Sequence, residues 1–145
     1  MRARTLALLL AVLAAGALAA CKPKPPAPPP PPAKPLTFVQ TTPDATVKLT
    51  IAPAIAEWPG LHEKIYNDGV AELKRDIETA KNDRAHLAGE GFPNPAYEHE
   101  LSWSLAAHNI RLVSLKGSWF SYTGGSHPNS GFNTLLWDVN AAEIA

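Results

Sequence analysis

The sequence predicts an α+β domain over residues 36–145, an antiparallel β-sheet with one long amphipathic helix packed on it. Apolar residues recur at steps of three and four between residues 61 and 84, which is the period of a helix. In the segments on both sides they alternate with polar residues, which is the period of strands. A chain of this length forms one domain that buries roughly 65% of its unfolded surface.

The first 20 residues have the features of a secretory signal peptide. Arg2 and Arg4 precede an apolar run from Leu6 to Ala20, which is too short for a membrane span. The run leads to Cys21, the one cysteine of the chain, in the context Leu-Ala-Ala-Cys. This ending resembles the bacterial lipoprotein signal, in which the chain is cut before an acylated cysteine. We expect lipid on Cys21 to anchor the protein to the membrane, the alternative being an ordinary secreted protein.

Residues 21–35 carry the anchor cysteine and a proline-rich spacer. Proline fixes φ and donates no backbone hydrogen bond, so the spacer should be an extended polyproline II rod of about 3.1 Å per residue. Lys22 stands where many lipoproteins of Gram-negative bacteria carry the aspartate that retains them in the inner membrane. We therefore expect the outer membrane, with the domain facing the periplasm.

The charge of the domain argues against nucleic acid as a partner. The chain has 13 basic and 13 acidic residues, but five of the basic ones precede residue 36, which leaves 8 against 13. A mildly acidic domain lacks the basic surface that a phosphate backbone requires.

The first predicted element of the domain is a β-hairpin. Segments 36–40 and 45–52 are rich in β-branched residues, and Pro43-Asp44 between them is a turn sequence.

The helix is predicted over residues 61–84. Its apolar stripe has seven members: Ile65, Tyr66, Gly69, Val70, Leu73, Ile77 and Ala80. Charged residues lie largely on the opposite side of the predicted helix and indicate a solvated face: Lys64, Asp68, Glu72, Arg75 and Glu78. Trp58, beside Pro59, is expected to pack as a wedge at the helix entrance.

Three strands are predicted after the helix. The first alternates, with one face made of Tyr97, His99, Leu101, Trp103, Leu105 and Ala107 and the other of Glu98, Glu100, Ser102 and Ser104. The second covers residues 109–122, with a bend or bulge at Gly117. The last covers residues 132–139.

A loop motif stands between the last two strands. Gly124-Gly125 predicts a turn with positive φ at both glycines, and Pro128 favours an extended His127. The connection of residues 123–131 is longer than a tight hairpin needs, which is typical of functional loops.

The element order and this motif resemble a known family. Tyr-Thr-Gly-Gly-Ser-His stands at residues 122–127, and Ile51–Ile55 leads from the hairpin into the helix. Over roughly residues 37–138 the chain resembles the PdaC-type and RsiV-type envelope domain, the accessory domain that precedes the catalytic domain in peptidoglycan deacetylases. The usual string of that family has alanine in place of Ser126.

Two departures from the family pattern limit what the resemblance implies. The motif of the family lies at the junction with a downstream domain, whereas this chain stops at Ala145, so we expect a domain truncated at its C-terminus. Its apolar end could then not be shielded completely, so it would self-associate or bind a partner; the residues concerned are Leu135, Leu136, Trp137 and Ile144. The Thr-Phe-Asp-Asp-Gly and His-x-x-x-His strings of the deacetylases do not occur. The resemblance therefore implies the accessory module without the enzyme.

The histidines have no spacing typical of a metal motif, so we expect no catalytic residue, no metal and no cofactor. A spatial cluster of His99, His108, His127 and Asp138 stays open. For His127 three roles stay open: fixing the loop by hydrogen bonds, binding a ligand, and metal binding or catalysis.

The leading hypothesis is a lipid-anchored, non-catalytic envelope protein that binds cell-wall glycan (peptidoglycan) or an envelope protein such as a lysozyme-like one. The candidate binding residues belong to the motif: Tyr122, Thr123, Gly124, Gly125, His127 and Asn129. The strand aromatics are either core residues or a glycan platform: Trp103, Trp119, Phe120, Tyr122, Phe132 and Trp137. The alternative is a small envelope hydrolase, a metal-dependent deacetylase that uses His127.

Overall fold

The computed structural model describes Lys34 and residues 36–91 and 93–145. The predicted signal peptide, Cys21 and the predicted spacer apart from Lys34 lie outside the described residues. The elements of the described part are β1 (Thr37–Thr41), β2 (Ala45–Ile51), the short 3₁₀ helix η1 (Pro53–Glu57), α2 (Pro59–Leu87), β3 (Tyr97–His108), β4 (Leu112–Tyr122), β5 (Asn129–Asp138) and β6 (Glu143–Ile144). None of its helices is long and apolar enough to cross a membrane.

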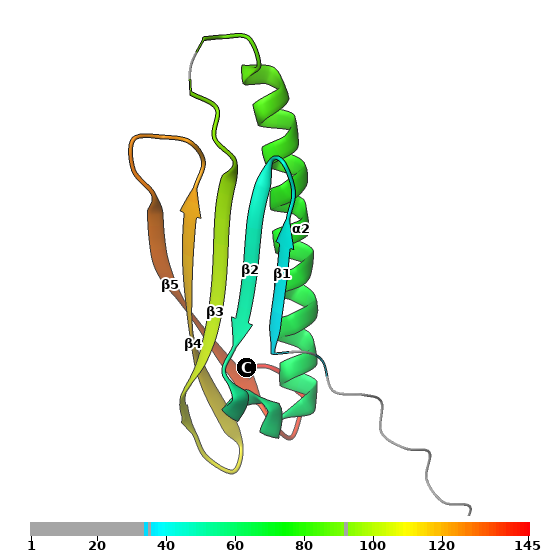
Figure 1. Cartoon of the computed structure of the whole chain (residues 1–145). Coiled ribbons are helices and arrows are strands. Elements are labelled where there is room, and N and C mark those ends of the chain that lie inside the picture. The colour runs from blue at the N-terminus through cyan, green and yellow to red at the C-terminus, as the bar shows by residue number, and fades with distance from the viewer. Residues whose placement is uncertain (1–33, 35, 92) are drawn as a thin grey trace, which may run out of the picture. The chain divides into compact units, whose positions relative to one another are not determined.

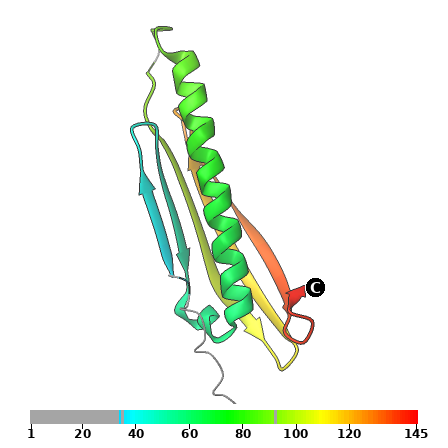
Figure 2. The ribbon, with the colours of Figure 1, turned by 90° about the vertical axis from the view of Figure 1, so that its right-hand side faces the viewer.

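One sheet of six strands in chain order makes up the described domain, and α2 lies along one face of it (Figures 1 and 2). This confirms the predicted α+β class. Neighbouring strands are antiparallel except β2 and β3, which are parallel. The strands β2 and β3 are parallel because α2 connects them. Its 29 residues return the chain to the end of the sheet where β2 began, so β3 runs in the same direction as β2.

The predicted hairpin is confirmed, and a side chain closes its turn. The Thr42 Oγ1 atom accepts hydrogen bonds from the backbone N–H groups of Asp44 and Ala45, at 3.2 and 3.0 Å. This is a local side-chain turn of the kind that Thr forms between strands.

The helix extends beyond its predicted bounds at both ends. It begins at Pro59. A backbone N–H group at the first position of a helix has no partner within the helix, so proline, which lacks this group, suits that position. The predicted apolar stripe faces the sheet, although Tyr66 and Val70 are only half-buried at its margin. Trp58 stands immediately before the helix, as expected, and packs against the core.

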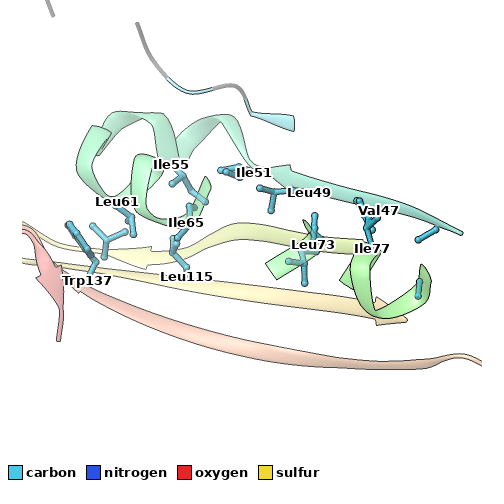
Figure 3. Close-up of a cluster of buried hydrophobic side chains, with 14 residues drawn as sticks. Val47, Leu49, Ile51, Ile55, Leu61, Ile65, Leu73, Ile77, Leu115 and Trp137 are labelled. Atoms are coloured by element: carbon cyan, nitrogen blue, oxygen red, sulfur yellow. The ribbon is translucent and has the colours of Figure 1, made fainter. Parts of the chain in front are cut away.

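The core lies between α2 and the middle of the sheet (Figure 3). Alternate residues of β2 point toward the helix and are buried: Ala45, Val47, Leu49 and Ile51. Gly69 permits the close approach of α2, because a Cβ atom there would lie 3.1 Å from the Leu49 methyl groups. Leu115 of β4 and Trp137 of β5 extend the core toward the start of the helix.

The irregularity between β3 and β4 lies in β3, so the predicted bulge at Gly117 is wrong. Gly117 pairs in register with Trp103, and the register shifts between Leu105 and Ala107 instead. The predicted alternation of β3 therefore holds as far as Leu105, and Ala107 beyond the shift is exposed.

The end of the chain differs from the prediction in two ways. The strand predicted over residues 132–139 begins earlier, at Asn129, and the short strand β6 follows it. The segment near β6 turns back toward the start of α2, and Trp137 becomes buried near Gly60. Of the four apolar residues expected to be incompletely shielded, Leu136 and Ile144 are exposed, Leu135 is half-buried and Trp137 is buried.

Candidate functional site

The motif forms the connection between β4 and β5, which is residues 123–128 and thus shorter than predicted. Gly124 has a φ of 82°, and a Cβ atom there would lie 3.3 Å from Pro95. Gly125 does not have a positive φ, so the prediction of two left-handed glycines is wrong. The reason is that one left-handed residue suffices to turn a connection of this length.

The candidate residues of the motif lie mostly at the surface. Tyr122 ends β4 and is half-buried, Gly124 is half-buried against Pro95, and Thr123, Gly125 and His127 are exposed. Asn129 is exposed at the start of β5. The structure brings these residues together in one loop and leaves their side chains available for contacts with other molecules.

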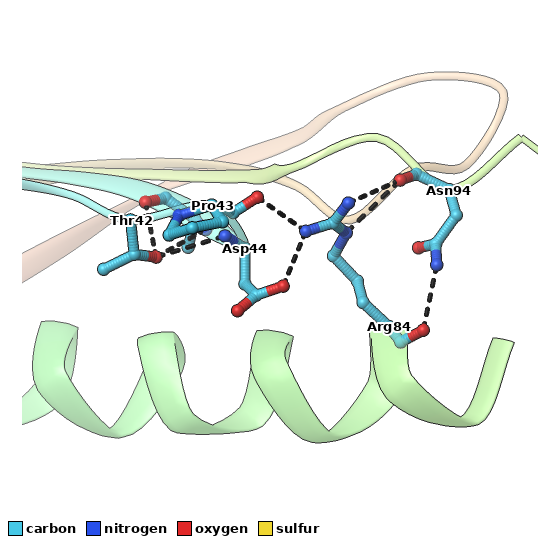
Figure 4. Close-up of polar contacts among 6 residues, drawn as sticks. Thr42, Pro43, Asp44, Arg84 and Asn94 are labelled. Atoms are coloured by element: carbon cyan, nitrogen blue, oxygen red, sulfur yellow. Dashed lines mark hydrogen bonds and ion pairs between the residues drawn. The ribbon is translucent and has the colours of Figure 1, made fainter. Parts of the chain in front are cut away.

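Arg84 joins three segments at the end of the domain where α2 ends (Figure 4). Its guanidinium donates to the carboxylate of Asp44 and to the carbonyl of Pro43, both at 2.6 Å. It also donates to the carbonyl of Asn94 at 3.2 and 2.9 Å, and the Asn94 side-chain amide donates to the Arg84 carbonyl at 2.9 Å. These bonds hold the β1–β2 turn and the α2–β3 connection to the helix, and the motif loop contacts that connection at Pro95.

The considered cluster of His99, His108, His127 and Asp138 is not formed, because its members lie at two ends of the sheet. His99 pairs with Ser121, one residue before Tyr122, and so lies near the motif end. His108 and Asp138 lie at the other end, where the His108 ring packs edge-on against Trp58 at 5.2 Å.

Asp138 has a structural role at that other end. Its Oδ1 atom accepts hydrogen bonds from the backbone N–H groups of Asn140 and Ala141, and its Oδ2 atom lies 3.0 Å from the Arg111 Nε atom. The bond from Ala141, then that from Arg111, lower the pKa of Asp138 below its ordinary value.

The strand aromatics divide between the two faces of the sheet. Trp103, Trp119 and Trp137 face the helix, where a Cβ atom at Gly117 or Gly131 would collide with the indole of Trp103 or Trp119. Phe120, Tyr122 and Phe132 face the other way, because direct partners across a sheet share a face. In the part of the chain that the structure describes, no helix covers this second face, which we call the open face.

A hollow of about 260 Å³ lies on the open face, and Phe120, Phe132, Glu100, Ser102 and Ser118 line it. The two serine hydroxyls are hydrogen-bonded at 2.7 Å. The hollow thus combines aromatic faces with hydroxyls and a carboxylate.

Lys116 and Lys48 place positive charge near this hollow. The ammonium of Lys116 lies 4.3 Å from the ring centre of Phe132, and that of Lys48 lies 3.8 Å from a carboxylate oxygen of Glu100. The ammonium of Lys116 is attracted to the ring face of Phe132.

A second polar group lies between α2 and β3, on the helix side of the sheet. The His99 Nδ1 atom is 2.5 Å from the Asp76 Oδ2 atom, and a carboxylate oxygen of Glu72 is near both. The sequence prediction placed Glu72 on the solvated face of the helix and did not associate it with His99. Its four-residue spacing from Asp76 was the available signal, since such residues share a helix face.

Near this group, Tyr97 has a raised pKa. Its burial is the main cause, and the charge of Asp83, whose carboxylate lies 3.4 Å from the Tyr97 hydroxyl, adds to it.

Comparison with known proteins gives one family match. The family model described as deacetylase PdaC matches residues 41–130, a range that includes β2, α2, β3, β4 and the motif. No curated protein matches the chain.

Two solved structures of the DUF3298 family are similar to this chain. A protein from Pseudomonas aeruginosa is 20% identical with a TM-score of 0.45, and the alignment covers 78% of this chain and 56% of that protein. A protein from Bacteroides fragilis is 12% identical with a TM-score of 0.40, covering 75% of this chain and 56% of that protein. This chain thus spans little more than half the length of these proteins.

Proposed function

This chain belongs to the deacetylase PdaC family, and from that premise we propose that it is a non-catalytic module that binds cell-wall glycan through the open face of its sheet. The family places the domain at the cell envelope. Lipid on Cys21 would hold it there, with the outer membrane and the periplasmic side as the proposed location.

The observation that carries the proposal is the exposure of Phe132, a residue that is 72% accessible although it lies within strand β5. Phe120 lies beside it and lines the same hollow. Single exposed apolar residues are common at protein surfaces, but an exposed phenylalanine that lines a hollow together with a second aromatic side chain is typical of a binding surface.

The chemistry of the hollow suits a saccharide. The C–H groups of a sugar ring pack on an aromatic face, and its hydroxyls need donors and acceptors at the edge of that face. Glu100 supplies an acceptor, and the hydroxyls of Ser102 and Ser118 supply both. The motif loop follows Tyr122 at one end of the open face and would extend the contact surface along the glycan.

No observation favours the alternative of a hydrolase built on His127. The imidazole of His127 is exposed. In the described part of the chain, His108 and Asp138 lie at the other end of the sheet.

Sedimentation with insoluble peptidoglycan tests the proposed function. Phe132→Ala should weaken binding about tenfold, because one lost aromatic contact is worth roughly 0.5–1.5 kcal/mol beyond its buried area. Ile110→Ala is the matched control, since Ile110 is also an exposed apolar residue but lies in the β3–β4 turn. Equal binding by Phe132→Ala and wild type would exclude the open face as the glycan site, and a protein partner would then have to be sought.

A further inference from the structure

We propose that α2 and β3 together form a binding site for a divalent transition-metal cation of the zinc class, with Glu72, Asp76 and His99 as ligands. One ligand atom of each residue lies within 4.8 Å of the other two. The site is on the helix side of the sheet, so this inference does not rest on glycan binding at the open face.

The fold itself brings the three side chains together. Glu72 and Asp76 are separated by one helical turn and therefore lie on the same side of α2. His99 belongs to the residues of β3 that face the helix, because it pairs with the buried Val47 of β2. The parallel register of β2 and β3 thus sets His99 opposite Asp76.

The distances suit a metal ion after a small local movement. Zinc binds nitrogen at about 2.0–2.1 Å and carboxylate oxygen at about 2.0–2.2 Å, so two ligands at a tetrahedral angle stand roughly 3.4 Å apart. The Nδ1 atom of His99 and the Oδ2 atom of Asp76 are 2.5 Å apart, which is a hydrogen-bonding distance. A cation would replace the hydrogen of this bond and separate the two atoms by about 1 Å.

The third ligand is free to complete the site. Glu72 is exposed, and in the part of the chain that the structure describes it makes no hydrogen bond or ion pair. By contrast, Asp68, one turn earlier, is already paired with Lys64 at 2.9 Å. The side chain of Glu72 can therefore turn toward a cation without breaking an existing contact.

The donor set selects the class of metal. One imidazole with two carboxylates is a ligand set for zinc and its neighbours in the first transition row, whereas calcium and magnesium prefer oxygen donors alone. The two carboxylates also balance the charge of a divalent cation. His99 is shielded, with 17% of its side chain accessible, which limits competition from water.

Three protein ligands leave one tetrahedral position for a water molecule or a ligand oxygen. Asp76 and His99 line a hollow of about 120 Å³ that also includes Tyr97 and Ser121. Ser121 is the direct partner of His99 across the sheet and precedes the motif by one residue. A cation bound here would thus connect α2 to β3, next to strand β4, which leads into the motif loop.

The competing explanation is that the Asp76–His99 pair is only a hydrogen bond that ties α2 to β3. That role requires neither Glu72 nor a metal ion. The two explanations therefore differ in the effect of changing Glu72, whose exposed carboxylate contributes nothing to such a bond.

Calorimetric titration of tag-free, chelator-treated protein with zinc chloride tests the site. We expect one saturable site per chain, with Co²⁺ producing the intense visible absorption of tetrahedral coordination. Glu72→Gln should weaken zinc binding by at least the roughly tenfold that loss of a supporting residue causes, and His99→Gln should abolish it. Glu78→Gln is the matched control, because Glu78 is an exposed carboxylate of the same helix outside the three-ligand group, and it should bind like wild type.

Two results would overturn the proposal: no saturable zinc binding by the folded protein, or equal binding by Glu72→Gln and wild type. Circular dichroism of each variant establishes that it is folded. If His99→Gln fails to fold, Glu72→Gln decides alone, because that residue is exposed. Glycan binding measured in the presence of chelator keeps this test separate from that of the open face.

Discussion

Trp103 occupies the space that a side chain at Gly117 would need. The two residues are direct partners across β3 and β4, and a Cβ atom at Gly117 would lie 2.9 Å from the indole ring. The same relationship recurs one strand further, where a Cβ atom at Gly131 would lie 2.8 Å from Trp119. Each indole thus covers the backbone of the neighbouring strand, which explains two glycines inside regular strands.

Gly117→Ala should therefore destabilise the domain by about 1–3 kcal/mol, the usual cost of overpacking a fitted site. Urea denaturation measures the effect. Gly125→Ala is the control, because nothing lies within 4 Å of a Cβ atom there and its φ is not positive. Equal stability of the two variants would contradict the packing relationship.

Arg84→Ala should destabilise the domain by about 1.5–3 kcal/mol, because the guanidinium makes charged hydrogen bonds to two loops in a partly buried setting. Arg84→Lys should recover part of this loss, since the ammonium keeps the charge but lacks the planar array of donors with which the guanidinium bonds both Asp44 and Asn94. Hydrogen exchange at the amides of Asn94, Ala96 and Tyr97 should accelerate in Arg84→Ala. If exchange there is unchanged, Arg84 does not hold the α2–β3 connection.

Asp138 should make stability depend on pH in the acid range. Its pKa in the folded protein is below the ordinary value of 3.8, so folding favours the ionised form. The resulting stabilisation is complete above that ordinary value and is lost as pH falls through the lowered pKa. Asp138→Asn should melt below wild type at neutral pH, and the two melting curves should converge in acid; a constant gap down to pH 2 would contradict this.

Cys21→Ser tests the lipid anchor, which rests on sequence alone. The change removes the thiol that would be acylated, so the protein should leave the membrane fraction and lose labelling by a palmitate analogue. Lys22→Asp is a second variant that keeps the cysteine. If the residue after Cys21 determines which membrane holds the protein, that variant should move from the outer to the inner membrane fraction. Unchanged membrane retention of Cys21→Ser would exclude lipidation as the anchor.

The regular elements could be predicted because their patterns are local. Seven apolar residues at helical spacing predicted α2, and strict alternation predicted β3 as far as Leu105. The sequence did not reveal β6, since a strand of two residues, Glu143–Ile144, is too short to show a period. The bulge was assigned to Gly117 because glycine often marks one, whereas the glycine there accommodates Trp103.

The candidate sites were harder to predict, because they depend on which elements cross. His99 and Asp76 are 23 residues apart, and only the position of α2 over β3 brings them together. From the sequence alone, the aromatic residues of the strands likewise form one group. Their division between the two faces follows from strand register, which side-chain alternation alone does not give.

Within the motif, Gly124 should matter more for stability than His127. Gly124 has a φ of 82° and lies close to Pro95, so Gly124→Val forces a β-branched residue into a left-handed conformation at a cost of about 1–3 kcal/mol. His127 is exposed, and His127→Ala should change stability by no more than about 0.5 kcal/mol. Gly125→Val separates backbone strain from general intolerance of the loop, because Gly125 has no positive φ and should tolerate the change better than Gly124. Thermal melts of the three variants give the order directly. A larger loss in His127→Ala than in Gly124→Val would mean that the imidazole, and not the turn, fixes the loop.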